Sequence, residues 1–225
     1  MYSYRKILRA ASYTPVETLR GDVGSSLMIS RLMKGKLTYF KGISSRNNEL
    51  LKEIIRNDKC KLTKEVNMIL QEIKLSEFLN SSIEKIKLKC NEWDEEIWIT
   101  EIGKKNSLDL YKNFKVKIKQ ETYYNEEKSL IIFRMRTNTL NLNDRKRFQN
   151  ESTECQLCKN EIENLEHFLL HCPALEDQRK EILALQRPRI QEDRDLLRDL
   201  LFESHPEKEK LHNLWIQRKK ILKDI

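Results

Sequence analysis

The sequence contains few of the residues that tight turns require. Its 225 residues include five glycines and four prolines, a composition that favours helices and disfavours a β-sandwich with many turns. No apolar run approaches the length needed to span a membrane, so we expect no membrane partner. No secretory or transit segment is evident, and we therefore expect an intracellular protein of the nucleus or cytoplasm.

Several catalytic motifs are also missing. No Asp-Asp pair occurs, although a polymerase palm uses adjacent carboxylates to hold two divalent metals. The sequence also lacks the phosphate-binding loop G-x-x-x-x-G-K-S/T, the dinucleotide fingerprint G-x-G-x-x-G, the zinc-protease motif H-E-x-x-H and a nuclease-type Pro-Asp. We therefore expect neither an enzymatic activity nor a small-molecule substrate.

The sequence does contain a compact group of metal-ligand candidates. Cys155, Cys158, His167 and Cys172 form the pattern C-x2-C-x8-H-x4-C. This pattern predicts a tetrahedral zinc site, with two thiolates from one tight turn and two further ligands from a following helix. Four protein ligands leave no open position, so the zinc is expected to be structural. His171 is a rival fourth ligand, because it lies four residues after His167 on the same helix face.

The residues around these ligands predict how the segment folds. Asn164 is expected to cap a short helix that begins at Leu165, and Pro173 is expected to end that helix.

Ordinary reduced cysteines or a disulfide would be alternatives to a metal site. The total of five cysteines is odd, and an intracellular protein would keep its thiols reduced, so a disulfide is disfavoured.

The positive charge is concentrated toward the start of the chain. The net charge is +8, and residues 1–46 hold nine lysines and arginines against two acidic residues. Residues 151–225 are mildly acidic, with 13 basic and 16 acidic side chains. A basic face is typical of phosphate binding, although a solvated helical surface would have the same composition.

Apolar spacing predicts a mainly α fold. Helices are expected at residues 62–75, 82–102, 126–136, 175–185 and 196–202 and near residues 211–221. Residues 108–119 indicate a helix, but their alternating lysines leave a short strand open. We divide the chain into a helical connector (residues 1–148), a zinc-organised CCHC knuckle with its following helix (149–185) and C-terminal helices (186–225).

Two helices are expected between residues 15 and 40, separated by a turn at Gly21-Asp22. In the second of them, one face is expected to be apolar and to contain Met28, Leu32 and Tyr39. The opposite face is expected to be basic and to contain Arg31 and Lys34.

Residues 133–140 (FRMRTNTL), the knuckle, the string from Glu166 to Pro173 (EHFLLHCP) and Arg179 together resemble the C-terminal end of non-LTR (LINE-type) retrotransposon reverse transcriptases. Residues 15–24 more weakly resemble the segment after the thumb of these enzymes. The resemblance implies zinc binding by Cys155, Cys158, His167 and Cys172, and contact with template RNA or target DNA near the knuckle. The catalytic palm is absent, so polymerase activity is not implied for this chain, which could belong to a longer polyprotein.

Two functional hypotheses follow. The first is a non-catalytic, zinc-binding part of a reverse transcriptase that positions RNA or DNA. The second is a zinc-stabilised protein-interaction module or scaffold that binds no nucleic acid; an inert fragment is a third reading. Under the first hypothesis, the candidate phosphate contacts are Arg31, Lys34, Lys36, Lys41, Arg134, Arg136, Arg145, Lys146 and Arg147.

Overall fold

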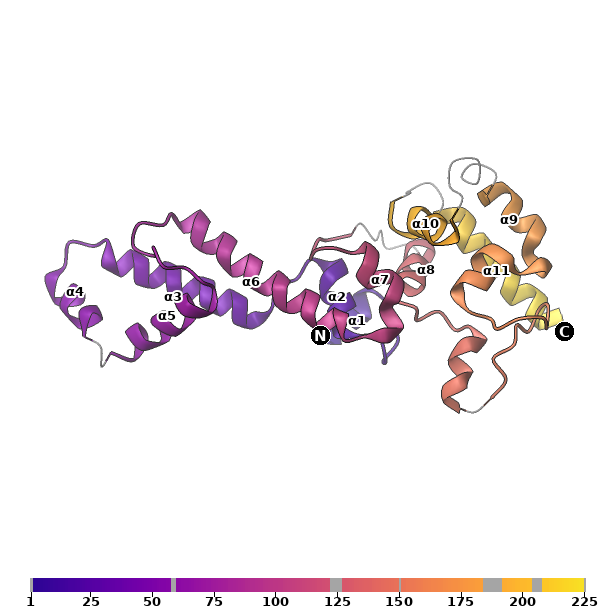
Figure 1. Cartoon of the computed structure of the whole chain (residues 1–225), viewed down its shortest axis with the longest axis horizontal. Helices are drawn as coiled ribbons and strands as arrows, with labels where there is room; N and C mark the ends of the chain where they lie inside the picture. Colours follow the sequence, from indigo (N-terminus) through magenta and orange to yellow (C-terminus); the bar gives the residue numbers. More distant parts are fainter. Residues whose placement is uncertain are drawn as a thin grey trace. The chain divides into compact units, whose positions relative to one another are not determined.

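The computed structural model describes residues 2–57, 60–121, 127–149, 151–183, 192–203 and 208–224. These residues are mainly helical, as predicted, and they contain no strand, only an isolated bridge between Glu154 and Ile162. The chain forms two compact units, one made of residues 20–104 and 117–120 and the other of residues 1–19, 105–116 and 121–225 (Figure 1). Within the described ranges, no helix is both long and apolar enough to cross a membrane.

Residues 20–104 and 117–120, here called the α3–α6 unit, are built on two long helices that pack against each other. These are α3 (Met28–Ser44) and α6 (Ile83–Gly103), and they are joined by α4 (Glu49–Arg56) and α5 (Lys61–Glu72). Helix α6 confirms the helix predicted at residues 82–102, and Ser82 caps it by accepting a hydrogen bond from Lys85 N at 3.1 Å. The core contains Met33, Leu37, Phe40, Val66, Ile69, Phe78, Ile86 and Cys90.

A buried ion pair fixes the start of α3. Arg20 Nη2 lies 2.8 Å from Asp94 Oδ1, and both side chains are buried. The carboxylate of Asp94 also accepts hydrogen bonds from the backbone N–H of Leu27, at 3.2 and 3.3 Å. Leu27 is the N-cap residue of α3, so Asp94 binds its N–H from α6 as the acidic residue of a capping box would do from within the helix.

The break before α3 does not lie at Gly21-Asp22, as the sequence analysis expected. Helix α2 (Val16–Val23) continues through these residues, and the chain turns at Gly24, whose φ is +70°. A Cβ at Gly24 would lie 2.7 Å from the backbone nitrogen of Gln120. Both the left-handed φ and this close approach favour glycine, so Gly24 rather than Gly21 ends the helix.

The predicted apolar face of α3 was also wrong. Met33, Leu37 and Phe40 face the core, whereas Met28 and Tyr39 are exposed. Helix α3 contains two apolar stripes, and the spacing of the apolar residues does not determine which stripe is buried in the core. The stripe that ends in Phe40 packs against Phe78, with ring centroids 6.0 Å apart.

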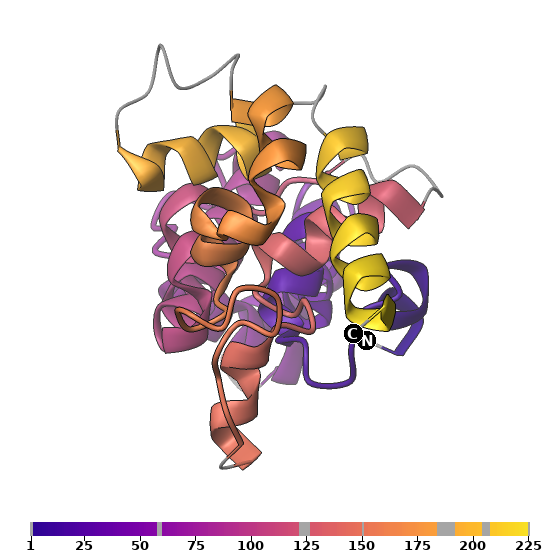
Figure 2. The ribbon, with the colours of Figure 1, turned by 90° about the vertical axis from the view of Figure 1, so that its right-hand side faces the viewer.

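The remaining residues, here called the α8–α11 unit, contain the knuckle and the C-terminal helices. Its two central helices are α8 (Glu127–Arg136) and α11 (Lys208–Asp224), which contact each other (Figure 2). The other α-helices are α1 (Tyr2–Ile7), the first part of α2, α7 (Asp109–Phe114), α9 (Glu176–Leu183) and α10 (Asp193–Arg198). Shorter turns are η1 (Asn106–Leu108), η2 (Asn143–Gln149), η3 (His167–His171), η4 (Pro173–Leu175) and η5 (Asp199–Glu203).

The α8–α11 unit has one apolar core that includes the knuckle. Phe168 packs edge-on against Trp215 of α11, with ring centroids 5.9 Å apart. The core contains Ile132, Met135, Cys155, Leu169, Cys172, Leu175, Leu200, Leu214 and Trp215.

The strand considered for residues 108–119 does not form. Helix α7 ends at Phe114, and residues 115–121 have no regular structure.

The division of the chain into two units differs from the three predicted ranges. Residues 149–185 and 186–225 were predicted to be separate, but they fall in the same unit.

Candidate metal centre

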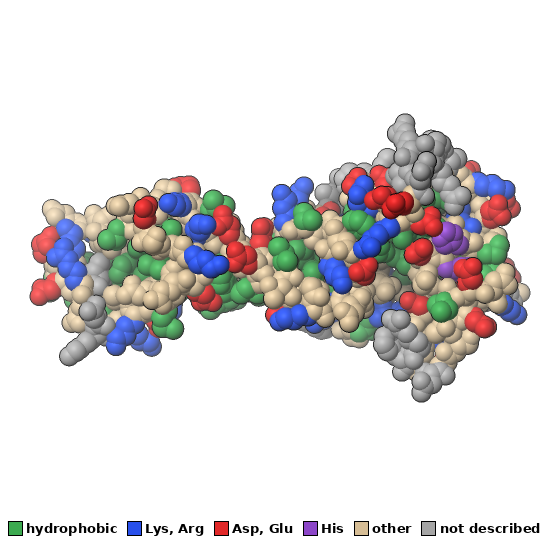
Figure 3. Space-filling model, viewed as in Figure 1, with side chains coloured by type: hydrophobic (Ala, Val, Ile, Leu, Met, Phe, Trp, Pro, Cys, Tyr) green, Lys and Arg blue, Asp and Glu red, His purple; other side chains and the backbone are tan. Residues whose placement is uncertain are grey.

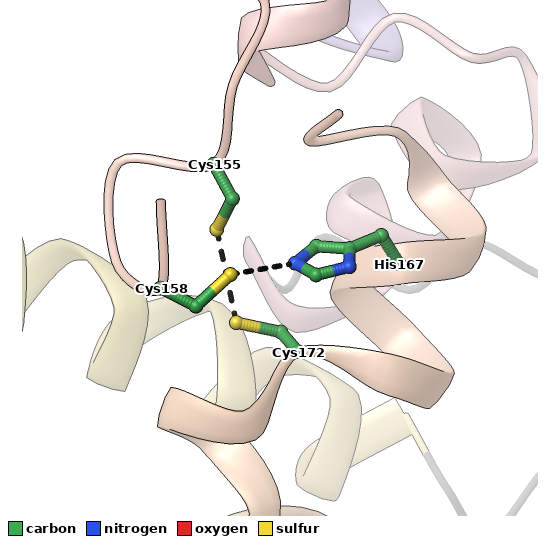
Figure 4. Close-up of side chains that lie close together, drawn as sticks. All are labelled: Cys155, Cys158, His167 and Cys172. Carbon is green, nitrogen blue, oxygen red and sulfur yellow. Dashed lines mark hydrogen bonds between the residues drawn. The ribbon is translucent and has the colours of Figure 1, made fainter. Parts of the chain in front are cut away.

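The first two ligand candidates lie on a tight turn. The backbone N–H of Cys155 donates to Glu161 O at 2.7 Å, and the N–H of Lys159 donates to Cys155 O at 2.8 Å. Lys159 has a φ of +56°, the left-handed conformation that such a turn requires after Cys158. These hydrogen bonds fold the turn so that both thiols point to the same side (Figure 4).

The other two ligand candidates lie on a helical segment that begins as predicted. Asn164 Oδ1 accepts a hydrogen bond from His167 N at 2.7 Å and so caps the segment that starts at Leu165. Residues His167–His171 form a π-helical turn, and Cys172 N donates to His167 O at 2.7 Å. In a regular α-helix a residue five positions on would point away from His167, whereas the wider π-turn brings Cys172 back toward the side of His167.

The four side chains converge on one point (Figure 4). Their ligand atoms all lie within 4.8 Å of one another, with Cys158 Sγ 3.3 Å from His167 Nε2 and Cys155 Sγ 3.7 Å from Cys172 Sγ. Cys155, His167 and Cys172 are buried and Cys158 is half-buried. The group could therefore hold a metal ion, and a set of three thiols and one imidazole fits the donor preference of a structural zinc site.

A carboxylate orients the histidine ring. Glu161 Oε2 lies 3.0 Å from His167 Nδ1, and this contact leaves Nε2 facing the thiols. Metal-binding histidines commonly have such a partner, which fixes the tautomer and raises the basicity of the ligand nitrogen.

The thiols differ in how readily they ionise. Burial raises the pKa of Cys155, and burial together with the neighbouring Cys155 raises the pKa of Cys172 to about 12. Burial also opposes ionisation of Cys158, but hydrogen bonds led by the backbone N–H of Asn160 outweigh it and lower its pKa. Three thiolates so close together need a positive charge among them, which a divalent cation supplies when it displaces the protons.

A buried network attaches the knuckle to α11. Arg218 donates two hydrogen bonds to Glu163, from Nε to Oε1 at 2.7 Å and from Nη2 to Oε2 at 2.6 Å. The backbone N–H of Asn143 also donates to Glu163 Oε2 at 2.9 Å, and Cys155 Sγ lies 3.8 Å from Glu163 Oε1. The side chains of Glu163 and Arg218 are 1% and 5% exposed, so the pair is almost completely desolvated.

Glu161, Glu163 and Arg218 were missed in the sequence analysis. Glu161 and Glu163 lie inside the knuckle, where the spacing of the ligands gave no reason to single out a carboxylate. Arg218 is 55 residues away from Glu163, and no local pattern connects the two.

His171, the rival fourth ligand, lies apart from the four converging side chains. Its Nε2 lies 3.1 Å from Asp193 Oδ2 and 3.8 Å from Glu166 Oε1, and its side chain is 38% exposed. The structure therefore brings together the set that contains Cys172.

The four basic candidates on α3 lie at the surface of the α3–α6 unit, and each makes a polar contact. Lys36 pairs with Glu65 at 2.6 Å, and Lys34 donates to Asn91 Oδ1 at 2.6 Å. Arg31 is exposed and donates to Ser25 Oγ at 2.9 Å, and Lys41 donates to Leu79 O at 3.0 Å. On the face shown in Figure 3, lysine and arginine side chains alternate with acidic ones.

The basic candidates near the knuckle have other roles. Arg136 is buried; it donates to Leu201 O, pairs with Glu121 and lies over the ring of Phe202, so it stabilises the core and cannot contact a phosphate at the surface. This corrects its assignment as a phosphate contact.

Arg134 donates to Arg9 O at 3.0 Å, and Arg145 donates to Asn138 O and stacks on Tyr13. Lys146 pairs with Glu151 at 3.4 Å near the surface. The side chain of Arg147 lies outside the described residues.

Replacing Glu121 with glutamine is expected to lower the free energy of unfolding at pH 7 by about 3 kcal/mol, because the buried side chains of Arg136 and Lys115 would lose their counter-charge. Burial raises the pKa of Glu121, but the hydrogen bond from Lys115 and the charge of Arg136 outweigh it, so the pKa lies below 4.5. The stabilisation is therefore present above pH 4.5 and lost as the pH falls through the lowered pKa.

Urea unfolding of the natural sequence and of Glu121→Gln, at pH 7 and at pH 3, measures the difference in the free energy of unfolding. A matched control is Glu203→Gln, which affects a solvent-exposed pair with Arg198 and should change stability by less than about 1 kcal/mol. A difference between Glu121→Gln and the natural sequence that stays constant with pH would contradict the assignment.

No model of a protein family matches the sequence, and no curated protein or solved structure is significantly similar to it.

Proposed function

We propose that this chain is a zinc-binding, non-catalytic part of a LINE-type reverse transcriptase that positions RNA or DNA. The observation that carries the proposal is the convergence of Cys155, Cys158, His167 and Cys172 within 4.8 Å. The donor set supports zinc, because three thiolates and an imidazole suit this ion and leave it no open position for a reaction. The ion would hold the turn and the following helix together.

The proposed relation to reverse transcriptases is supported by the order of the motifs along the chain. The string FRMRTNTL at residues 133–140 precedes the knuckle, and EHFLLHCP at residues 166–173 closes it. No Asp-Asp pair is present, so the proposed role is to position a nucleic acid rather than to extend one.

Nucleic-acid contact is proposed for the basic side chains that remain at the surface. Arg31, Lys34 and Lys36 lie within two turns of α3, and Lys41 follows further along the helix. Their partners there are neutral groups or, for Lys36, an exposed glutamate, and phosphate oxygens could replace them.

Binding of a single-stranded oligonucleotide is expected to weaken steeply with salt. If about three of these cations contact phosphates, the slope of log K against log salt concentration should be about −2 for a single strand. Replacing Arg31, Lys34 and Lys36 with alanine should weaken binding and flatten the slope toward zero. Fluorescence anisotropy of a labelled RNA at 50 to about 300 mM salt measures both quantities.

The matched control removes three positive charges elsewhere. Lys219, Lys220 and Lys223 lie on α11, and their replacement with alanine should leave the slope almost unchanged. An affinity that is indifferent to salt, or equal losses in the two triple variants, would contradict the proposed contact surface.

A second candidate function is a protein-interaction module, and one observation favours it. Ile29, Leu32 and Met68 are exposed apolar side chains that line a groove of about 210 Å³ between α3 and α5. Recovery of a protein partner by the zinc-loaded chain, without any binding to RNA or DNA, would favour this alternative.

A further inference from the structure

Three side chains outside the four-ligand group also bring their polar atoms together. His171 Nε2 lies 3.1 Å from Asp193 Oδ2 and 3.8 Å from Glu166 Oε1. One potential ligand atom from each of the three residues lies within 4.8 Å of the other two. The side chains are between 38% and 54% exposed, so an ion can reach them from solution.

Two separate segments supply these side chains. Glu166 is the N-cap residue of η3, His171 is the last residue of this turn, and Asp193 is the first residue of α10. Leucines of both segments belong to the same apolar core, namely Leu169, Leu170, Leu196 and Leu197. The core therefore holds the two backbones at a fixed separation, and the three polar side chains meet at its surface.

The wide turn of η3 explains why Glu166 meets His171. These two residues are five positions apart, as are His167 and Cys172. A regular α-helix points residues at this spacing in different directions, whereas the wider π-turn brings each pair back toward a common side. One pair faces the thiols and the other faces Asp193, so a single irregular turn supplies two side chains to each group.

The separations suit ligands of one metal ion. Zinc–nitrogen and zinc–oxygen bonds of about 2.0–2.2 Å place neighbouring ligand atoms about 3.0–3.5 Å apart. His171 and Asp193 already have such a separation. Glu166 is slightly farther from His171, and a small rotation of its exposed side chain would close the difference.

The charge of this group favours a cation. Among the residues that the structure describes, neither Glu166 nor Asp193 pairs with a lysine or an arginine. Arg194, which follows Asp193, pairs instead with Asp109 at 3.2 Å. Two carboxylates therefore share one imidazole, and a divalent cation would neutralise both of them. The alternative is an ordinary ion pair with a protonated His171, which binds no metal.

We propose that Glu166, His171 and Asp193 form a second divalent-cation site, separate from the four-ligand group. An imidazole and two carboxylates suit Zn²⁺ or Mn²⁺ and lack the thiolates that a structural zinc site prefers. Three protein ligands leave positions open for water, and the exposure of the site makes its ion exchangeable. A chain purified without added metal therefore holds only the ion that the thiols bind. This site does not depend on the binding of RNA or DNA.

Manganese tests this site without displacing the ion from the first, because thiolates favour zinc whereas carboxylates accept Mn²⁺. The full chain, loaded with zinc and freed of excess metal, is titrated with Mn²⁺, and the paramagnetic resonance signal of the unbound ion measures binding. We expect the natural chain to bind one Mn²⁺. His171→Ala and Asp193→Asn should each weaken this binding by roughly 10-fold or more, since even the loss of an outer partner of a metal ligand typically costs that much.

Asp195→Asn is the matched control. Asp195 also lies in the first turn of α10, but it pairs with Arg198 at 3.1 Å and is not part of the group. The control should bind Mn²⁺ as the natural chain does. All three variants should retain the zinc of the thiols, and elemental analysis of this zinc shows that the knuckle is folded.

Two outcomes would overturn the second site. If the natural chain binds no Mn²⁺, His171 forms an ordinary ion pair with its carboxylate neighbours. If the natural chain and all three variants bind Mn²⁺ with equal affinity, the binding is adventitious and lies elsewhere on the surface. Because His171 and Asp193 belong to different segments, misfolding of one variant still leaves the other to decide the result.

Discussion

Cys172→Ser is expected to abolish metal binding and unfold the knuckle. The purified natural chain should contain about one zinc ion, which the serine variant should lose. Zinc supplies on the order of 10 kcal/mol of folding free energy in small modules, so the variant should show a markedly lower stability of the α8–α11 unit. Elemental analysis gives the zinc content, and chemical unfolding with and without a chelator gives the stability.

His171→Ala is the matched control for this prediction. His171 is the adjacent residue on the same turn, but it lies beside Glu166 and Asp193 and apart from the thiols. The alanine variant should keep its zinc and nearly all of its stability. Loss of zinc in His171→Ala with retention in Cys172→Ser would show that the rival ligand set is the correct one, and a natural chain without metal would contradict both sets.

Arg218→Met is expected to lower the free energy of unfolding by about 3–5 kcal/mol, because it leaves Glu163 as a buried charge without its guanidinium partner. Glu163 is a residue of the knuckle, so the loss should extend to zinc retention when a competing chelator is present. Urea unfolding measures the stability, and a colorimetric chelator measures the rate of zinc release.

An exposed ion pair between α8 and α11 provides the control. Lys128 pairs with Glu209 at 2.7 Å with both side chains substantially solvated, so Lys128→Met should change stability by less than about 1 kcal/mol. The double variant Glu163→Leu/Arg218→Met should be less destabilised than the sum of its two single variants, since it buries no unpaired charge. Equal effects of Arg218→Met and Lys128→Met would contradict a role for the buried pair.

The features that the sequence predicted well depend on local chemistry. The positions of α5, α6 and α8 follow from apolar spacing, and the cap at Asn164 follows from a side chain close to the N–H group from which it accepts. The convergence of the four ligand candidates could also be predicted, because thiols and an imidazole at this spacing have few other common uses.

The features that could not be predicted depend on contacts between distant residues. Helix α3 has two apolar stripes, and only the packing of Phe40 against Phe78 decides between them. The sequence analysis predicted that Arg136 would be a surface cation, but Glu121, Leu201 and Phe202 surround it in the structure. Gly24, rather than Gly21, ends α2 because the backbone of Gln120 passes beside it.

The π-turn at His167–His171 makes the length of this segment more important than the identity of its residues. Phe168, Leu169 and Leu170 pack in the core, where another apolar side chain of similar volume could replace any of them. Insertion of a residue into this turn would carry Cys172 further round the helix and away from His167, whereas removal of one would restore the α-helical spacing that also keeps the two side chains on one face. Evolution of this segment is therefore constrained against insertions more strictly than against apolar substitutions.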